Sequence, residues 1–139
     1  MSTRSRWLFV ALTAALLVPA TRARAADIQA DPSNYRTLLS TLQPGDRLIL
    51  AAGDYPDGLP ITDMEGTAGS PIVITGPETG NPAVLLGNSS RNTVSIRRSA
   101  YVTVRHLVID GQNLANVDAV KAEGGANNWS HHITLEHLT

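Results

Sequence analysis

The 139-residue chain contains no cysteine, which excludes disulfide bonds and thiolate metal sites. Aromatic residues make up only 4% of it. Stability must therefore come from burial and backbone hydrogen bonds. Long apolar runs are also missing, since the main one, residues 7–20, is shorter than the roughly 18 residues that a membrane-spanning helix needs. We expect no stable membrane span once the N-terminal segment has been removed.

That N-terminal segment has the order of a secretory signal. Arg4 and Arg6 precede the apolar stretch, and Ala23-Arg24-Ala25 offers a small-x-small cleavage site. We therefore predict a signal peptide over residues 1–25 and a secreted or periplasmic mature protein. An uncleaved N-terminal anchor is the alternative.

Removal of residues 1–25 changes the charge balance. Four of the 11 basic residues lie in that segment, so seven remain against 12 acidic ones, a net charge of −5. An acidic exported domain argues against a nucleic-acid partner.

Short apolar runs separated by Gly, Asn and Ser predict many short strands, as in a sandwich or a solenoid. Internal similarity favours the solenoid. Residues 101–108 align with residues 132–139 at an offset of 31, and residues 94–97 align with residues 120–123 at an offset of 26. The two offsets differ by five residues, which corresponds to an insertion near residues 126–130. A period in this range is typical of stacked repeats, so we predict an all-β, right-handed parallel β-helix.

The alternation of side chains within one repeat predicts where the chain turns. Apolar and polar residues alternate from residue 102 to Arg105, and the inward set resumes at Leu107. Two residues, Arg105 and His106, therefore separate consecutive inward positions where alternation would place one, and this break predicts a corner between two sheets. His137 occupies the equivalent position one repeat later.

The start of the mature chain predicts a lid. Residues 31–33 offer an N-cap, and Pro44-Gly45 would end the helix. We expect a short capping helix over about residues 33–42, laid across the end of the solenoid. Its apolar face would consist of Tyr35, Leu38, Leu39 and Leu42.

Three segments follow from these patterns: a signal peptide at 1–25, a cap segment with a short helix at 26–45, and β-helix coils at 46–139. Thr139 falls in the middle of a repeat, directly after an inward leucine. An open last coil would expose strand edges and core. We therefore expect a fragment from which the C-terminal coils are absent.

Two stretches carry a resemblance to a known group of proteins. QPGDRLILAAGDY at residues 43–55 and GTAGSPIVI at residues 66–74 resemble the opening of exported right-handed parallel β-helix proteins of the pectate-lyase-like superfamily. They are most similar to the openings of chondroitin and alginate lyases. The resemblance covers about residues 28–110 and marks the fold more than the activity. It implies that a basic residue takes the proton next to a uronic-acid carboxylate, which an arginine or a calcium ion neutralises. Those groups would lie beyond Thr139, so no catalytic residue is assigned.

Four basic residues are the candidates for binding an acidic polysaccharide, because arginine pairs with carboxylates in a bidentate manner. They are Arg97, Arg98, Arg105 and Lys121. The alternative is structural. The same registers place Arg97 beside Glu123 and Arg105 beside Glu136, as exposed ion pairs worth about 0.2–1 kcal/mol each.

Other polar residues have two interpretations each. His106 and His137 could form a metal or general-base pair, but a corner ladder fits better, because histidine is among the types that tolerate positive φ. His131-His132 could be ligands or solvated loop residues. Asp54, Asp57, Asp63 and Glu65 could hold calcium, yet they lack regular ligand spacing and fit turns better. We assign no metal site.

These observations predict an exported carbohydrate-active protein, a polysaccharide lyase that acts on uronic-acid-containing polymers by β-elimination. The alternative is a non-catalytic β-helix that binds glycans or serves as a surface module. We expect the 139-residue chain alone to lack lyase activity.

Overall fold

The computed structural model describes residues 25–126 and 128–139. The predicted signal peptide therefore lies almost wholly outside the described residues. The described chain is mostly β, with one short helix. The elements are β1 (Asp27–Ala30), α1 (Tyr35–Leu39), β2 (Arg47–Leu50), β3 (Gly53–Tyr55), β4 (Leu59–Thr62), β5 (Ile72–Thr75), β6 (Ala83–Leu86), β7 (Val94–Arg97), β8 (Ala100–Asp110), β9 (Val120–Glu123) and β10 (His131–Leu138). None of these residues forms a helix long and apolar enough to cross a membrane.

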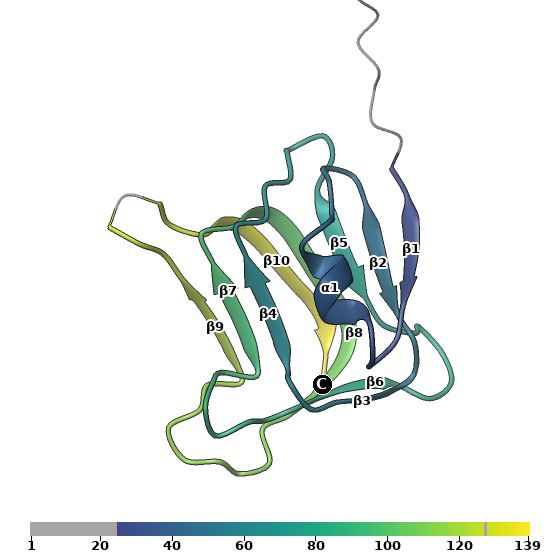
Figure 1. Ribbon diagram of the computed structural model, residues 1–139, viewed down its shortest axis with the longest axis vertical. Coiled ribbons are helices and arrows are strands. Elements are labelled where there is room, and N and C mark those ends of the chain that lie inside the picture. The colour runs from purple at the N-terminus through teal and green to yellow at the C-terminus, as the bar shows by residue number, and fades with distance from the viewer. Residues whose placement is uncertain (1–24, 127) are drawn as a thin grey trace, which may run out of the picture.

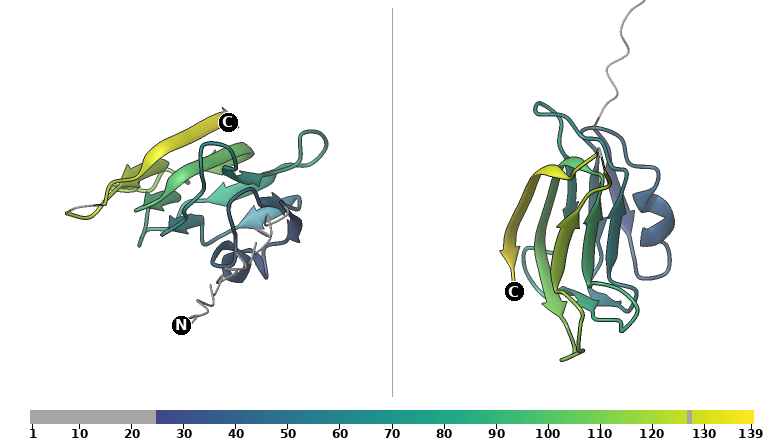
Figure 2. Two further views of the ribbon diagram at one scale, coloured as in Figure 1. Left: turned by 90° about the horizontal axis from the view of Figure 1, so that it is seen from above. Right: turned by 90° about the vertical axis from the view of Figure 1, so that its left-hand side faces the viewer.

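The named strands pair only in parallel and form three sheets (Figure 1). Sheet A contains β1, β2, β5, the first half of β8, and β10. Sheet B contains β3, β6 and the second half of β8, and sheet C contains β4, β7 and β9. From β2 onwards the chain visits A, B and C in turn, and we call each such passage a row. Equivalent strands of successive rows lie side by side (Figure 2).

The registers confirm the predicted offsets. Ile133 pairs with Val102 and Leu138 pairs with Leu107, which is the offset of 31. In sheet C, Val94 pairs with Val120, the offset of 26. A parallel stack requires such pairing, because every strand returns to the same sheet one row later.

Inward side chains of neighbouring rows form the core. Leu48, Ile74 and Val104 follow one another in register across β2, β5 and β8, and each has an exposed fraction of 0%. Full burial of an aliphatic side chain of this size contributes about 1.5–3 kcal/mol. Such columns give each row a continuous apolar contact with the next.

The predicted corner is present in β8. His106 has a φ of 53° and His137 has a φ of 50°, both in the left-handed region. At His106 the strand leaves sheet A and continues into sheet B. The two imidazole rings stack with their centroids 4.7 Å apart and their planes 5° apart. This arrangement matches the corner ladder predicted for the two histidines.

The capping helix predicted over about residues 33–42 is not evident, because the only helix in this segment, α1, covers five residues instead of about ten. Its N-cap residue is Asn34, and the Asp31 carboxylate accepts hydrogen bonds from Ser33 instead. The helix ends before Pro44-Gly45, since the Ser40 and Thr41 hydroxyls donate to carbonyls three residues back and compete with further helical turns.

The short helix still buries part of its apolar face. The side chains of Tyr35 and Leu39 are buried, whereas that of Leu38 is only half-buried. Tyr35 packs edge-on against Tyr55, with ring centroids 4.9 Å apart, and its hydroxyl donates to the carbonyl of Gly58. Figure 2 shows α1 beyond β1, at the opposite end of the stack from β10.

Candidate functional site

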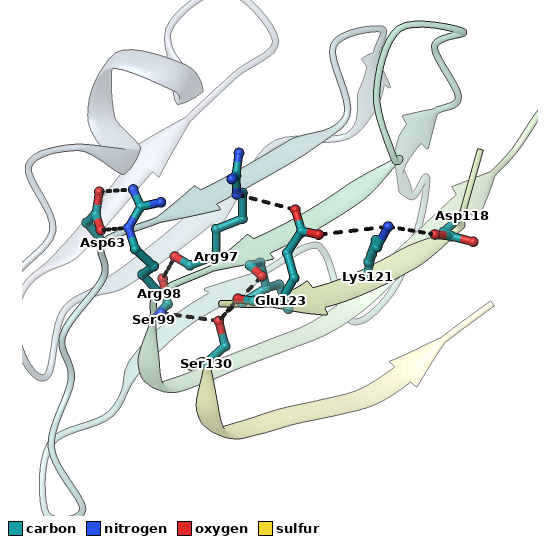
Figure 3. Close-up of polar contacts among 9 residues, drawn as sticks. Asp63, Arg97, Arg98, Ser99, Asp118, Lys121, Glu123 and Ser130 are labelled. Atoms are coloured by element: carbon teal, nitrogen blue, oxygen red, sulfur yellow. Dashed lines mark hydrogen bonds and ion pairs between the residues drawn. The ribbon is translucent and has the colours of Figure 1, made fainter. Parts of the chain in front are cut away.

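The structure brings three of the four candidate basic residues together on the outside of the stack (Figure 3). Arg97 is the last residue of β7, Lys121 lies on β9, and both belong to sheet C. Arg98 occupies the bend after β7, with a φ of 47°. Arg105 lies on β8 within sheet A, so it belongs to a different face.

Glu123 connects the two basic residues of sheet C. One of its carboxylate oxygens lies 3.3 Å from Arg97 Nε, and the other lies 3.8 Å from Lys121 Nζ. Lys121 also lies 3.8 Å from a carboxylate oxygen of Asp118. The predicted pair between Arg97 and Glu123 is thereby confirmed. All four side chains are substantially exposed, so these ion pairs contribute little to the free energy of folding.

Of the four candidate basic residues, Arg98 forms the shortest ion pair, with Asp63. The alignment of the repeats did not predict this pair. The Nε and one terminal nitrogen of Arg98 each donate to a different carboxylate oxygen of Asp63, at 2.7 Å. The hydrogen bonds from the guanidinium hold the pKa of the Asp63 carboxyl below its ordinary value, and the pKa of Arg98 is raised in turn. A lowered carboxyl pKa favours the fold at pH values above the ordinary one, and this contribution is lost as the pH falls through the lowered value.

A signal for the Arg98–Asp63 pair was present in the repeat. Thr62 of β4 pairs in register with Arg97 of β7, so Asp63 is the residue equivalent to Arg98 one row earlier. Both residues have positive φ and occupy equivalent bends in successive rows. Extending the alignment back to β4 would have placed the two side chains side by side.

Two serines fix the backbone beneath this charged surface. The Ser99 hydroxyl donates to the carbonyl of Arg97 and accepts from the amide of Met64. One row later, the Ser130 hydroxyl donates to the carbonyl of Glu123 at 2.7 Å (Figure 3). The bend between sheets C and A is therefore braced by hydroxyl groups in successive rows.

On sheet A, Arg105 lies 3.5 Å from Glu136, as predicted. Each of the four candidate basic residues thus has a carboxylate within 4 Å. A substrate carboxylate would have to compete with a protein carboxylate at every one of them. The arrangement can bind an anionic chain only by exchanging partners.

The other sequence candidates are dispersed. Asp57 lies 3.5 Å from Arg36, and Asp63 belongs to the pair with Arg98, so the acidic run does not converge. Within residues 25–126 and 128–139, no group of three or more His, Asp or Glu side chains could hold a metal ion. His131 and His132 contact each other through their Nδ1 atoms, 2.7 Å apart.

No family model matches the sequence, and no curated protein matches it. Several solved structures are similar. The PL6 family alginate lyase AlyGC matches 81% of this chain with a TM-score of 0.64 at 22% identity. A mannuronic acid specific polysaccharide family 6 lyase from human gut microbiota matches 78% with a TM-score of 0.61 at 21% identity. An alginate lyase from Paenibacillus sp. str. FPU-7 matches 81% with a TM-score of 0.53 at 26% identity.

The match covers a small part of each of those enzymes. This chain spans 15% of the length of the first, 25% of the second and 33% of the third. The similarity confirms the resemblance to alginate-lyase-type openings that the sequence indicated. The described part of the chain therefore has the parallel β architecture found in alginate lyases.

Proposed function

We propose that the chain is part of an exported polysaccharide lyase that cleaves uronic-acid-containing polymers by β-elimination. The observation that carries the proposal is the structural match over about four-fifths of the chain to enzymes described as alginate lyases. A further similar structure is described as a mannuronic acid specific polysaccharide family 6 lyase, which points to an acidic polysaccharide as the substrate class. The predicted signal peptide supports export.

The proposal includes a right-handed solenoid as the scaffold. Three rows that visit sheets A, B and C in the same order support it, as do parallel registers that continue from β4 through β7 to β9. Crossover connections between parallel strands are right-handed in nearly all known cases. Outward side chains of successive rows would then align along one wall, on which a linear polymer can lie.

Within this scaffold, the described rows serve to support the site more than to perform the chemistry. β-Elimination requires a base for the proton next to the carboxylate and a cation to neutralise that carboxylate. Arg97, Arg98 and Lys121 are each engaged by a protein carboxylate. We therefore place the catalytic groups, and any calcium ion, outside residues 25–139.

A second function is favoured by the same charge pairing. A wall whose cations are already paired lacks, within the described residues, the free cation that β-elimination requires, which suits the non-catalytic alternative, a β-helix that binds glycans through other groups or serves as a surface module. Such a protein would bind polysaccharide without cleaving it. The two proposals differ in one measurable product, the unsaturated uronate formed by elimination.

The experiment compares the protein encoded by the complete gene with the 139-residue chain. Each is incubated with alginate, chondroitin and pectate while the absorbance of the unsaturated product is followed. We expect a rise with the complete protein on at least one polymer and none with the 139-residue chain. Binding without any absorbance rise from the complete protein would establish the glycan-binding module instead. A rise with the chain alone would place the catalytic groups within it.

A further inference from the structure

A pocket on the outer face of sheet A has no part in the charged surface described above. Its volume is about 340 Å³, within the usual range for small-ligand sites. It lies between Pro71, the β8 residues Tyr101 and Thr103, and the β10 residues His132 and Thr134. None of the four candidate basic residues lines it.

Two aromatic rings form one wall of this pocket. Tyr101 and His132 stack with their centroids 4.3 Å apart and their planes 10° apart. Both residues have positive φ, 53° and 52°, and they follow Ala100 and His131, which pair with each other in register. His131 packs edge-on against Tyr101 and shares a hydrogen bond with His132 through Nδ1. The rings are therefore held in place before any ligand arrives.

Hydroxyl groups form the neighbouring part of the pocket. Thr103 and Thr134 pair in register, so their side chains lie on the same face of adjacent strands. A threonine hydroxyl can both donate and accept a hydrogen bond. The next outward position along β8, about 6.6 Å further on, is Arg105, which is already paired with Glu136. The pocket itself thus offers rings and hydroxyls and no uncompensated charge.

We propose that this pocket binds one pyranose unit of a polysaccharide. A pyranose ring combines apolar C–H groups, which can pack against the exposed side of the stacked Tyr101–His132 pair, with hydroxyl edges, which suit Thr103 and Thr134. The choice of a carbohydrate ligand rests on the proposed function. Because the contacts are uncharged, binding here differs from any attraction to the basic residues of sheet C in being insensitive to salt.

The experiment measures the affinity of the 139-residue chain for an alginate hexasaccharide by titration calorimetry in 0.5 M NaCl. The variants are His132→Asn and Thr134→Val. Asparagine tolerates the positive φ of His132, and valine keeps the β-branched shape of Thr134. We expect each variant to weaken binding by about fivefold to tenfold, as loss of one ring or hydroxyl contact predicts.

His137→Asn is the matched control, because His137 also lies on β10, also has positive φ and also stacks on an aromatic ring, that of His106, but does not line this pocket. We expect it to leave the affinity unchanged. Equal loss in the control, no loss in either variant, or no binding by the native chain at this salt concentration would each overturn the proposal. None of these outcomes bears on product formation by the complete protein, so the two proposals fail separately.

Discussion

Strands β5 and β10 occupy the same sheet and register, yet they differ in burial. Ile72 of β5 and Ile133 of β10 both pair in register with Val102 of β8. Ile72 has an exposed fraction of 0%, whereas Ile133 is only partly buried and Leu135 is 44% exposed. Within the described residues, β5 has strand neighbours on both sides and β10 has only β8.

The difference shows that two separate factors determine burial in a stack. The alternation along a strand decides which side chains point inward. The rows on both sides decide how much of an inward side chain is covered. A core position in this fold is therefore a property of three rows, and the sequence of one strand is not enough to identify it.

Replacing the two isoleucines tests this directly and should give the largest effect. Ile72→Ala leaves a cavity between two rows, so we expect a loss of about 2–5 kcal/mol in the free energy of unfolding. Ile133→Ala removes a side chain that is covered on one side, and we expect about 1 kcal/mol or less. Urea unfolding of both variants measures the difference. Equal losses would show that β10 is covered as completely as β5.

The sequence predicted the register because equivalent positions in successive repeats carry side chains of the same type, apolar or polar. Matching apolar residues gave the offsets of 31 and 26, and these gave the pairs between Arg97 and Glu123 and between Arg105 and Glu136. The corner at His106 followed from a break in the alternation, which the backbone confirms with a positive φ.

Features that depend on loops were missed. The Arg98–Asp63 pair joins two bends, where no alternation of apolar residues guides an alignment. The helix was predicted too long because Ser40 and Thr41 bond back to the main chain, a local competition that the apolar pattern does not reveal. Strand β1 falls in the segment assigned to the cap, and it pairs with β2 from Asp27 to Ala30.

Helix α1 provides a second comparison between a buried and a half-buried side chain. Leu39 is buried, whereas Leu38, predicted for the same apolar face, is half-buried and packs against the edge of the core. Leu39→Asp would place a charge against apolar surface, and we expect a loss of about 2 kcal/mol or more. Leu38→Asp should cost less. Thermal unfolding of both variants checks this order, and a larger loss from Leu38→Asp would contradict it.

Alkaline pH should act on the same end of the stack. Burial raises the pKa of Tyr55 to about 12, with a smaller contribution from the charge of Asp31. The neutral phenol is thus favoured in the folded state, so its contribution is complete below pH ~10, the ordinary value for tyrosine, and is lost as the pH rises toward 12. We expect the urea midpoint of the native chain to fall over this range, and that of Tyr55→Phe to fall less. Parallel declines would rule out Tyr55 as the source.

The smallest effects should come from the outer wall, where sheets A and C each carry a partly exposed ion pair. Arg97 faces Glu123 in sheet C, and Arg105 faces Glu136 in sheet A. Their positive potential is largely cancelled before a ligand arrives, and salt screens the remainder over a Debye length of about 8 Å. We therefore expect Arg97→Glu and Arg105→Glu to cost under about 1 kcal/mol of stability and to change retention on immobilised polyuronate little. A salt-gradient elution of the native chain and both variants measures retention. A marked loss for Arg97→Glu alone would show that sheet C exchanges its internal partners for substrate, and would make this surface part of the substrate groove.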